Sequence, residues 1–354
     1  MEERLLRVLR TVAPGTAFLK GLESILQAQT GALIFVLEDS HDLSIVEGGF
    51  TVNAPFTPSN LYELAKMDGA IVLSRDLKQI LFANTQLVPD LSIPSVETGI
   101  RHRTAERVAL QTNSLVISIS KRRKIITLYK GNIHYVLRDP GLVLAEANQA
   151  VQTLDKYKSV LNKAVGKLGI LEFENAASLF DAVQVIQRVE MVRRVVKELE
   201  GYISELGSEG RLITMQMEEL AVNVEQEGLL VIRDYGTLPE GKTAKDVMDD
   251  LGTWPSEDLL ELVLIGRALG FSGSNEILDQ PVYPKGYRLL DKIPRLPYVV
   301  TKNLVSHFSF LTNILSATLE ELYAVEGIGE ARARSIKSGL ERYQEHLNKG
   351  RYSW

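Results

Sequence analysis

The sequence predicts a multidomain protein, with an N-terminal α/β domain built on a mixed sheet, a helical spine and a small all-α module at the C-terminus. The chain has 354 residues, which is more than one hydrophobic core ordinarily organises. Short runs rich in Val, Ile and Leu are concentrated before residue 140, and helix-forming residues dominate after it. Pro and Gly punctuate the last part of the chain. We therefore expect domains at residues 1–140, 141–285 and 286–354.

The expected sheet lies between residue 31 and about residue 137. Short apolar runs alternate there with turn residues, a pattern typical of strands packed between helices. We expect a mixed sheet with helices on its faces. The expected strands are residues 32–37, 44–52, 70–73, 79–83, 115–119 and 125–129, and the expected helices are residues 2–12, 16–29, 60–66 and 104–111.

Asp139-Pro140-Gly141 marks the expected end of the α/β domain, because Pro and Gly interrupt regular structure. In the helical spine beyond it, apolar residues recur at alternating intervals of four and three, the spacing of a helix that packs along a partner. The partner is either the rest of a helical bundle, the interpretation we favour, or a second chain in a coiled coil. These residues are Val185, Val189, Val192, Val196, Leu199, Ile203 and Leu206.

Composition excludes several classes of protein. The chain has no cysteine, which rules out disulfides, thiolate zinc sites and thiol nucleophiles. Its longest uncharged apolar runs are far shorter than a membrane-spanning helix requires, and its first residues do not have the pattern of an export signal. The sequence therefore predicts a cytoplasmic protein that does not enter a membrane.

The first candidate site combines two motifs. Asp68-Gly69-Ala70 stands where an expected helix gives way to a strand, so that it presents a carboxylate beside a residue without a side chain. An ordinary Asp-Gly turn is the alternative. Further along, Arg101-His102-Arg103 leads into the helix expected from Thr104. Two guanidiniums near a helix N-terminus suit phosphate, although a solvated basic turn is also possible.

The residues around these motifs resemble the DisA family of DNA integrity scanning proteins, in its diadenylate cyclase domain. The resemblance is dense from about residue 5 to residue 137, and the order of the remaining segments agrees with the family. It is carried by MDGAIVLSRD at 67–76, ANTQLVPDLSIPSVETGIRHRTAERVALQT at 83–112 and LVISISKRRKIITLYKG at 115–131.

This resemblance implies an activity. Two cyclase domains would meet face to face with one ATP each, and each ribose 3′-hydroxyl would attack the α-phosphate of the other nucleotide, so that cyclic di-AMP forms and two pyrophosphates leave. A monomer would then be inactive, because the rate depends on holding the two nucleotides together. Face-to-face dimers joined by the spine would give a larger homo-oligomer such as an octamer.

The resemblance also implies roles for residues. Asp68 would bind Mg²⁺ or Mn²⁺ or assist deprotonation of the hydroxyl, and Arg101, His102 and Arg103 would be cations on the triphosphate. Ile100 departs from the family, which usually has Thr there, and this puts full activity in question. The remaining residues expected to bind ATP are Gly69, Leu87, Thr104 and Ser120.

A second pattern, from Gly236 to Thr243, satisfies the phosphate-binding loop motif G-x-x-x-x-G-K-[ST] with Lys242 as its lysine. A phosphate-binding loop requires a preceding strand within a parallel sheet, whereas residues 142–280 have a helical pattern. We therefore expect a chance match.

The C-terminal segment indicates a nucleic-acid partner. Residues 285–354 contain eleven Lys and Arg against seven Asp and Glu, whereas residues 221–280 contain four against twelve. Around residues 322–336 the pattern fits a helix-hairpin-helix that contacts DNA phosphates without reading bases, and a degenerate first hairpin with Leu296-Pro297 precedes it. A hairpin that docks on another protein or is purely structural is the alternative. The residues expected to bind DNA are Gly327, Ile328, Gly329, Arg332, Arg334 and Lys337.

The sequence therefore predicts a nucleoid-associated diadenylate cyclase, active in DNA damage and repair, whose binding to branched DNA or recombination intermediates regulates synthesis. A DNA-scanning protein with a weakened catalytic site is the first alternative. A nuclease is the second, although no acidic cluster suited to paired metals stands near the hairpins.

Overall fold

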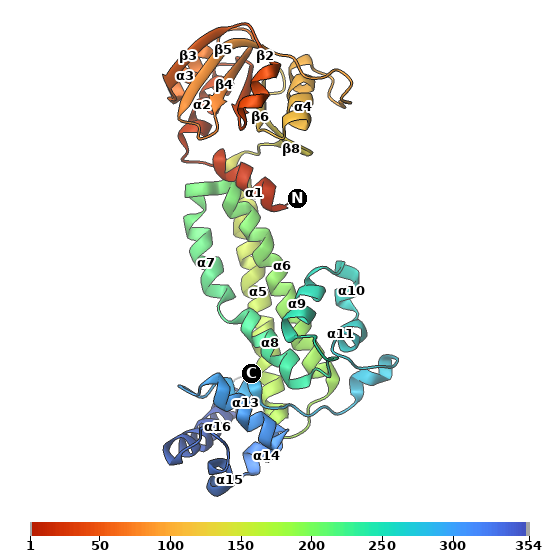
Figure 1. Ribbon diagram of the computed structural model, residues 1–354. Coiled ribbons are helices and arrows are strands. Elements are labelled where there is room, and N and C mark those ends of the chain that lie inside the picture. The colour runs from red at the N-terminus through yellow and green to blue at the C-terminus, as the bar shows by residue number, and fades with distance from the viewer. Residues whose placement is uncertain (1, 352–354) are drawn as a thin grey trace. The chain divides into compact units, whose positions relative to one another are not determined.

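The computed structural model describes residues 2–351, which form two compact units (Figure 1). The first unit contains the residues up to 149 together with residues 199–215, and the second contains residues 150–198 and the chain from residue 216 onward. The chain thus leaves the first unit and returns to it, which the expected division at residues 140 and 285 does not anticipate. No helix within residues 2–351 has both the length and the apolar character needed to cross a membrane.

The first unit is built on a mixed sheet of eight strands, which confirms the predicted fold class. The strand order is β2-β5-β4-β1-β6-β7-β8, and β3 pairs with β5. Only the β1–β4 pairing is parallel among the pairings of the described chain. The strands are β1 Ala32–Leu37, β2 Val46–Glu47, β3 Phe50–Pro55, β4 Ala70–Ser74, β5 Gln79–Leu87, β6 Val116–Ser120, β7 Ile125–Lys130 and β8 Ile133–Val136.

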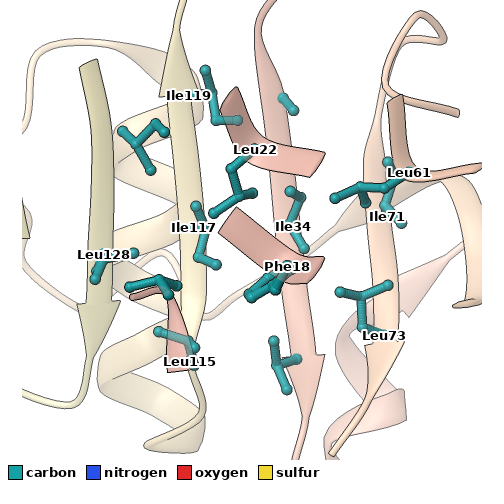
Figure 2. Packing of buried hydrophobic residues seen from close by; sticks show 14 of the residues in the cluster. Phe18, Leu22, Ile34, Leu61, Ile71, Leu73, Leu115, Ile117, Ile119 and Leu128 are labelled. Carbon is teal, nitrogen blue, oxygen red and sulfur yellow. The ribbon is translucent and has the colours of Figure 1, made fainter. Parts of the chain in front are cut away.

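Helices cover both faces of this sheet because its central strands are apolar on both sides. Successive side chains of a strand point to opposite faces. In β1, Ile34 therefore packs with Phe18 and Leu22 on one face (Figure 2), and Phe35 packs with Val108 on the other. The helices of the unit are α1 Glu2–Thr11, α2 Ala17–Gln27 and α3 Pro58–Leu64 on the first face and α4 Ile100–Thr112 on the second.

Two expectations about the sheet are wrong. The strand expected at residues 44–52 is interrupted, because residues Ser40–Ile45 form a 3₁₀ helix and Gly48 and Gly49 adopt positive φ angles of 64° and 78°. Strands β2 and β3 lie on either side of that turn. Strand β8 was not predicted, because its residues Ile133–Val136 alternate between partly buried and exposed and form no strong apolar run.

The second unit is helical. In α6, Val185, Val189 and Val192 are fully buried, and Gly228 of α8 packs so closely that an added Cβ would lie 2.7 Å from Val189. This chain therefore covers that apolar face, as the helical-bundle interpretation expects. The elements from residue 140 to residue 279, of which residues 140–149 and 199–215 belong to the first unit, are α5 Pro140–Phe173, α6 Leu179–Leu206, η2 Gly207–Gly210, α7 Arg211–Ala221, α8 Val224–Tyr235, α9 Ala244–Gly252, α10 Ser256–Leu260, α11 Leu262–Ala268 and η3 Asn275–Asp279.

Short helices end the chain and share one apolar cluster. Arg288 anchors them to the rest of the second unit. It is fully buried, pairs with Glu172 and lies 3.1 Å from Glu227, while the Asp234 carboxylate accepts backbone N–H bonds from residues 286–288. The helices are α12 Tyr287–Asp291, α13 Tyr298–Phe308, α14 Leu311–Ser316, α15 Leu319–Tyr323 and α16 Glu330–Arg351.

Candidate functional site

The strand register brings the two predicted motifs to one edge of the sheet. Leu33 of β1 lies opposite both Ala70 of β4 and Ser118 of β6. The start of β4, the start of β1 and the end of β6 therefore form one row of three neighbouring strand ends, and Asp68, residue 31 and Ser120 lie at these ends or within two residues of them. Adjacent strands are about 4.8 Å apart, so this row spans about 10 Å, the scale of a nucleotide triphosphate.

The backbone at position 69 explains why the acidic motif contains a glycine. Its φ is 93°, and an added Cβ would lie 2.7 Å from the backbone oxygen of Thr85 in β5. The buried Thr85 hydroxyl also donates to the carbonyl of Ala70 at 3.0 Å. Only glycine fits this position without strain. The turn thus holds Asp68 at the start of β4, where its side chain is exposed.

Arg101 reaches the same edge. Its guanidinium lies against Gly31, directly before β1, where an added Cβ would clash with Nη1 and would lie 3.1 Å from the carbonyl oxygen of Ile119. The backbone of β1 therefore makes room for this guanidinium. Gly31 was not predicted as a site residue, since an isolated glycine before a strand gives no sign of the side chain that will pack on it.

Helix α4 begins earlier than expected. Gly99 is its N-cap and Ile100 its first residue, so that Arg101, His102 and Arg103 lie in the first turn and Thr104 does not head the helix. Thr104 resembles an N-cap in sequence, whereas the actual cap makes no side-chain hydrogen bond. Arg103 is exposed and donates to the carbonyl of Thr98 at 3.3 Å. The basic motif is thus part of a helix N-terminus rather than a loop before it.

The segment from Val88 to Gly99 is held against α4 by hydrogen bonds. Gln111 accepts from the Asp90 N–H at 2.9 Å, Arg107 donates to the carbonyl of Ile93 at 2.8 Å, and Glu106 accepts from the Val96 N–H at 3.1 Å. Several large apolar side chains are exposed in this segment or next to the two motifs. These residues, which we call the apolar rim, are Met67, Val88, Leu91, Val96 and Ile100, with Val96 92% and Ile100 84% exposed.

His102 is the buried member of the basic motif, with 7% of its surface exposed. Its Nδ1 lies 2.9 Å from the Tyr129 hydroxyl, which donates to Glu97 at 2.8 Å, and Glu97 lies 3.4 Å from His134. Burial lowers the pKa of His102, and Arg123, Arg101 and His134 act in the same direction while Glu97 opposes them. A neutral ring fits poorly with the expected role as a cation on the triphosphate.

Leu87 and Ser120, two other residues expected to bind ATP, differ in how much of their side chains is available to a ligand. Leu87 ends β5 at the same edge, but it is only 6% exposed and packs in the apolar cluster beneath α4, so its side chain has little surface to offer an adenine. Ser120 ends β6 half buried, and its hydroxyl accepts the Arg123 N–H at 3.2 Å. Arg123 also donates to the Thr98 hydroxyl at 3.4 Å, which directs one residue of the basic β6–β7 turn toward the site.

A cavity of about 830 Å³ opens at the opposite edge of the sheet. It lies between α1, the β4–β5 turn and the ends of β1 and β7, and its lining includes Arg4, Glu38, Arg75 and Lys130. None of the predicted nucleotide-binding residues lines it. The candidate nucleotide site is therefore the exposed edge that carries the two motifs, and not this cavity.

Comparisons with known proteins cover nearly the whole chain. Sequence profiles described as the nucleotide-binding and the linker regions of the DisA bacterial checkpoint controller match residues 19–133 and 137–278. The chain is 58% identical over 347 residues to the DNA integrity scanning protein DisA of Carboxydothermus hydrogenoformans, covering 98% of this chain and 99% of that protein. It belongs to the DisA family.

Another DisA relative, from Clostridium perfringens, is 52% identical over 346 residues, covering 98% of this chain and 97% of that protein. Among solved structures, the chain is similar to a double mutant of DacA from Staphylococcus aureus. That likeness has a TM-score of 0.30 at 18% identity and covers 39% of this chain and 89% of the other.

The phosphate-binding loop pattern of this DisA family member is a chance match. The element before it is helix α8, Val224–Tyr235, and not a strand. Thr243 caps α9 through a reciprocal pair of hydrogen bonds with Asp246, and Lys242 bonds to Asp250 at 2.8 Å. The Lys and Thr of the pattern thus serve local helix capping and pairing.

The C-terminal segment of the family member forms a helix, a turn and a second helix at the predicted place. Gly327 has a φ of 85°, Ile328 is buried, and Gly329 directly precedes α16 with open space where a Cβ would lie. Two glycines there leave the N-terminus of α16 open to an anion, where its backbone N–H groups and helix dipole favour negative charge.

The cations expected beside this turn are partly engaged. Arg332 donates to the carbonyl of Gly327, Arg334 pairs with Glu330, and Lys337 donates to the carbonyl of Leu315 at 2.9 Å. The earlier turn between α12 and α13 holds Pro294 and Pro297, which have no N–H to donate. The two turns are therefore unequal, as the sequence predicts.

Proposed function

We propose that the first unit condenses two ATP molecules into cyclic di-AMP and releases two pyrophosphates. One observation carries this proposal: Asp68, the guanidinium of Arg101 and Ser120 lie along one edge of the sheet, although they are far apart in sequence. A carboxylate and guanidiniums on about 10 Å of surface match the hydroxyl and the phosphates of one nucleotide. Membership of the DisA family, with its nucleotide-binding region over residues 19–133, supports the same activity.

The roles follow from position. The guanidinium of Arg101, packed on Gly31, and that of Arg103 stabilise the negative charge that moves to the leaving pyrophosphate. Asp68 is exposed and held by a turn that only glycine can make, so that it receives a hydroxyl or a divalent cation at a fixed place. The first turn of α4 adds backbone N–H groups toward the phosphates.

A divalent cation fits Asp68 as a partner carried in by the nucleotide. Within residues 2–351, no group of three or more metal-ligating side chains gathers to hold a cation alone. Mg²⁺ commonly binds through one or two carboxylates together with substrate phosphates and water. Mg²⁺ or Mn²⁺ bound to Asp68 and the triphosphate would supply charge neutralisation at the reacting phosphate.

The second nucleotide comes from a second copy of the chain. The five side chains of the apolar rim are exposed next to Asp68 and Arg101 in the sequence and on the segment between β5 and α4, and exposed apolar groups of this kind indicate an interface. Ile100 replaces the usual Thr of the family at the first position of α4, where its side chain is exposed, so the replacement leaves the core of the unit unchanged.

The activity is tested by incubating the full chain with ATP and Mg²⁺ or Mn²⁺, followed by chromatography for a cyclic dinucleotide. Product is expected from the wild type, and a loss of at least about 100-fold from Asp68→Asn, since the acid carries the hydroxyl or the metal. Specific activity should rise with protein concentration and fall in Val96→Asp. Equal product from Asp68→Asn would refute this assignment, and no product from the wild type would favour a DNA-scanning protein without catalysis.

We also propose that the turn before α16 binds DNA phosphates, branched DNA in particular, and that this binding regulates synthesis on the nucleoid in the cytoplasm. The support is the open N-terminus of α16 behind Gly327 and Gly329, within a basic segment. Contacts of this type are independent of base sequence.

Fluorescence anisotropy with a four-way junction and a linear duplex tests this binding. Gly329→Ala should fold normally, since Gly329 has an ordinary φ and open space, but it should weaken binding about tenfold by blocking the approach of a phosphate. Gly166→Ala is the control, since Gly166 also has open space around it but lies within α5, away from this turn in the sequence. Unchanged affinity in Gly329→Ala, or degradation of labelled DNA, would count against the proposal. Coupling requires that saturating junction DNA alters the rate of ATP conversion.

A further inference from the structure

The first unit contains a chain of hydrogen bonds, buried or partly buried, that ends at the histidine of the basic motif. It runs from Glu97, at the end of the segment held against α4, through the hydroxyl of Tyr129 in β7, to Nδ1 of His102. Glu97 is 12% exposed in its side chain, and Tyr129 is 1% exposed. Three residues from three separate elements thus meet behind the first turn of α4.

The direction of these hydrogen bonds fixes the state of the His102 ring. Burial, together with Glu97, raises the pKa of Tyr129 far above its ordinary value, so its hydroxyl stays protonated. It donates a hydrogen bond to the Glu97 carboxylate. The Tyr129 oxygen can then only accept, and Nδ1 of His102 must be the donor. A neutral imidazole that donates from Nδ1 has an unprotonated Nε2 with a free lone pair.

That lone pair lacks a partner. Among the described residues of the first unit, the only buried side-chain nitrogen or oxygen atoms without a hydrogen bond are His102 Nε2 and Ser118 Oγ. Ser118 follows Val116 by two residues in β6, so both atoms lie on the side of the sheet that α4 covers. His102 Cδ2, the ring carbon next to Nε2, would lie 3.7 Å from a Cβ added at Gly99, the cap of α4. The ring thus packs beside the cap of α4 through Cδ2, and Nε2, bonded to that carbon, is buried without a partner.

We propose that Glu97 and Tyr129 are positioning residues that hold His102 as the neutral Nδ1–H tautomer, so that Nε2 accepts a hydrogen bond from a hydroxyl of the bound nucleotide. The inference rests on the proposed cyclase activity for its substrate, since ATP brings ribose hydroxyls to this edge. It assigns His102 a function as an acceptor at the ribose and leaves the phosphates to the arginines. A carboxylate that fixes a histidine tautomer through a hydrogen bond is a known route to an efficient acceptor.

Tyr129→Phe is the decisive variant, because it retains the ring that packs in the core and removes only the hydroxyl. Tyr135→Phe is its matched control, since Tyr135 in β8 also donates to a glutamate, Glu205, at 2.9 Å, but has no bond to His102. Glu97→Gln retains an oxygen that accepts from Tyr129 and removes the charge. All variants are made in the full chain.

Nitrogen-15 NMR of ring-labelled histidines reads the tautomer directly and requires no catalysis. The chain has five histidines, and the signals missing in His102→Leu identify the relevant ring. We expect the wild type, Tyr135→Phe and Glu97→Gln to show His102 as the Nδ1–H tautomer, and Tyr129→Phe to show a mixture. A pure Nδ1–H form in Tyr129→Phe would overturn the proposal even if the wild type made no product.

Steady-state kinetics provide the second measurement. We expect Tyr129→Phe to lower kcat at least about tenfold with KM for ATP within about threefold, because the arginines still bind the phosphates. Tyr135→Phe should match the wild type in both constants. A wild-type kcat in Tyr129→Phe would refute the positioning role, whereas a wild type without product would refute the cyclase proposal and leave the tautomer measurement to decide the hydrogen-bond chain.

Discussion

Two deeply buried polar side chains, one in each unit, differ in whether their polar atoms have partners. Arg288 in the second unit is fully buried, and the carboxylates of Glu172 and Glu227 neutralise it on two sides. His102 in the first unit is almost as buried, but its Nε2 has no partner among the described residues. Buried polar groups in folded proteins are nearly always hydrogen-bonded. The satisfied network therefore indicates a structural role, and the unsatisfied ring indicates a site that a ligand completes.

The largest effect expected from this comparison is on stability. Arg288→Met should reduce the free energy of unfolding by about 3–5 kcal/mol, because the buried Glu172 carboxylate would be left without its cation, while Glu227 would keep only Lys292. Urea unfolding followed by the fluorescence of the two tryptophans, one of which is Trp254 in the second unit, measures it. Arg334→Met is the control, since its pair with Glu330 is largely exposed and contributes little. A loss below about 1 kcal/mol in Arg288→Met would mean that the network is not structural.

His102→Leu should show the opposite profile. The ring makes one hydrogen bond and leaves one nitrogen unsatisfied, so an apolar side chain of similar volume should change the free energy of unfolding by no more than about 1 kcal/mol. Cyclic dinucleotide production should fall about 100-fold, the usual contribution of a positioned acceptor. Retention of activity within threefold would place His102 among ordinary core residues.

A smaller effect is expected from Gly31→Ala. The new Cβ would clash with the Arg101 guanidinium and displace it from the row that it shares with Asp68 and Ser120. Loss of one charge-assisted bond corresponds to about a tenfold increase in KM for ATP. Gly166→Ala, with open space around it, should leave KM unchanged. An unchanged KM in Gly31→Ala would show that the guanidinium does not contact the nucleotide.

The smallest effect is a dependence on pH. The pKa of His102 is lowered from 6.5 by burial and by Arg123, Arg101 and His134, against the pull of Glu97. Below pH 6.5 the unfolded chain therefore binds a proton that the folded chain does not, and stability is lost as the pH falls. The free energy of unfolding should drop more between pH 7.5 and pH 5.5 in the wild type than in His102→Leu. Parallel losses in both proteins would contradict the assignment.

Much of the fold could be predicted because the central strands are continuous apolar runs in the sequence. The runs at Ala32–Leu37 and Ala70–Ser74 are apolar on both faces, as strands covered by helices on both sides must be. The prediction of one strand over residues 44–52 was wrong, because two glycines with positive φ and a 3₁₀ helix interrupt this segment. The Gly48-Gly49 pair is a turn signal, so this break was visible in the sequence.

The candidate site was predictable only where a motif carries its own chemistry. The acidic and basic motifs are visible in the sequence, and the strand register accounts for their meeting at one edge. The burial of His102 was not predictable, because it depends on Tyr129, which lies 27 residues later, and on Glu97 in a segment without regular structure. The roles assigned to the site residues stay predictions until the variants are measured.

The false phosphate-binding loop provides a control substitution for ATP assays on this chain. Lys242 bonds to Asp250 and Thr243 to Asp246, and the element directly before them is helix α8 and not a strand. Motif scanning would nevertheless select Lys242→Ala as the inactivating substitution for any ATP assay on this chain. Such a variant should convert ATP at the normal rate, which makes it a sham mutant that distinguishes genuine loss of nucleotide chemistry from the side effects of mutagenesis and purification.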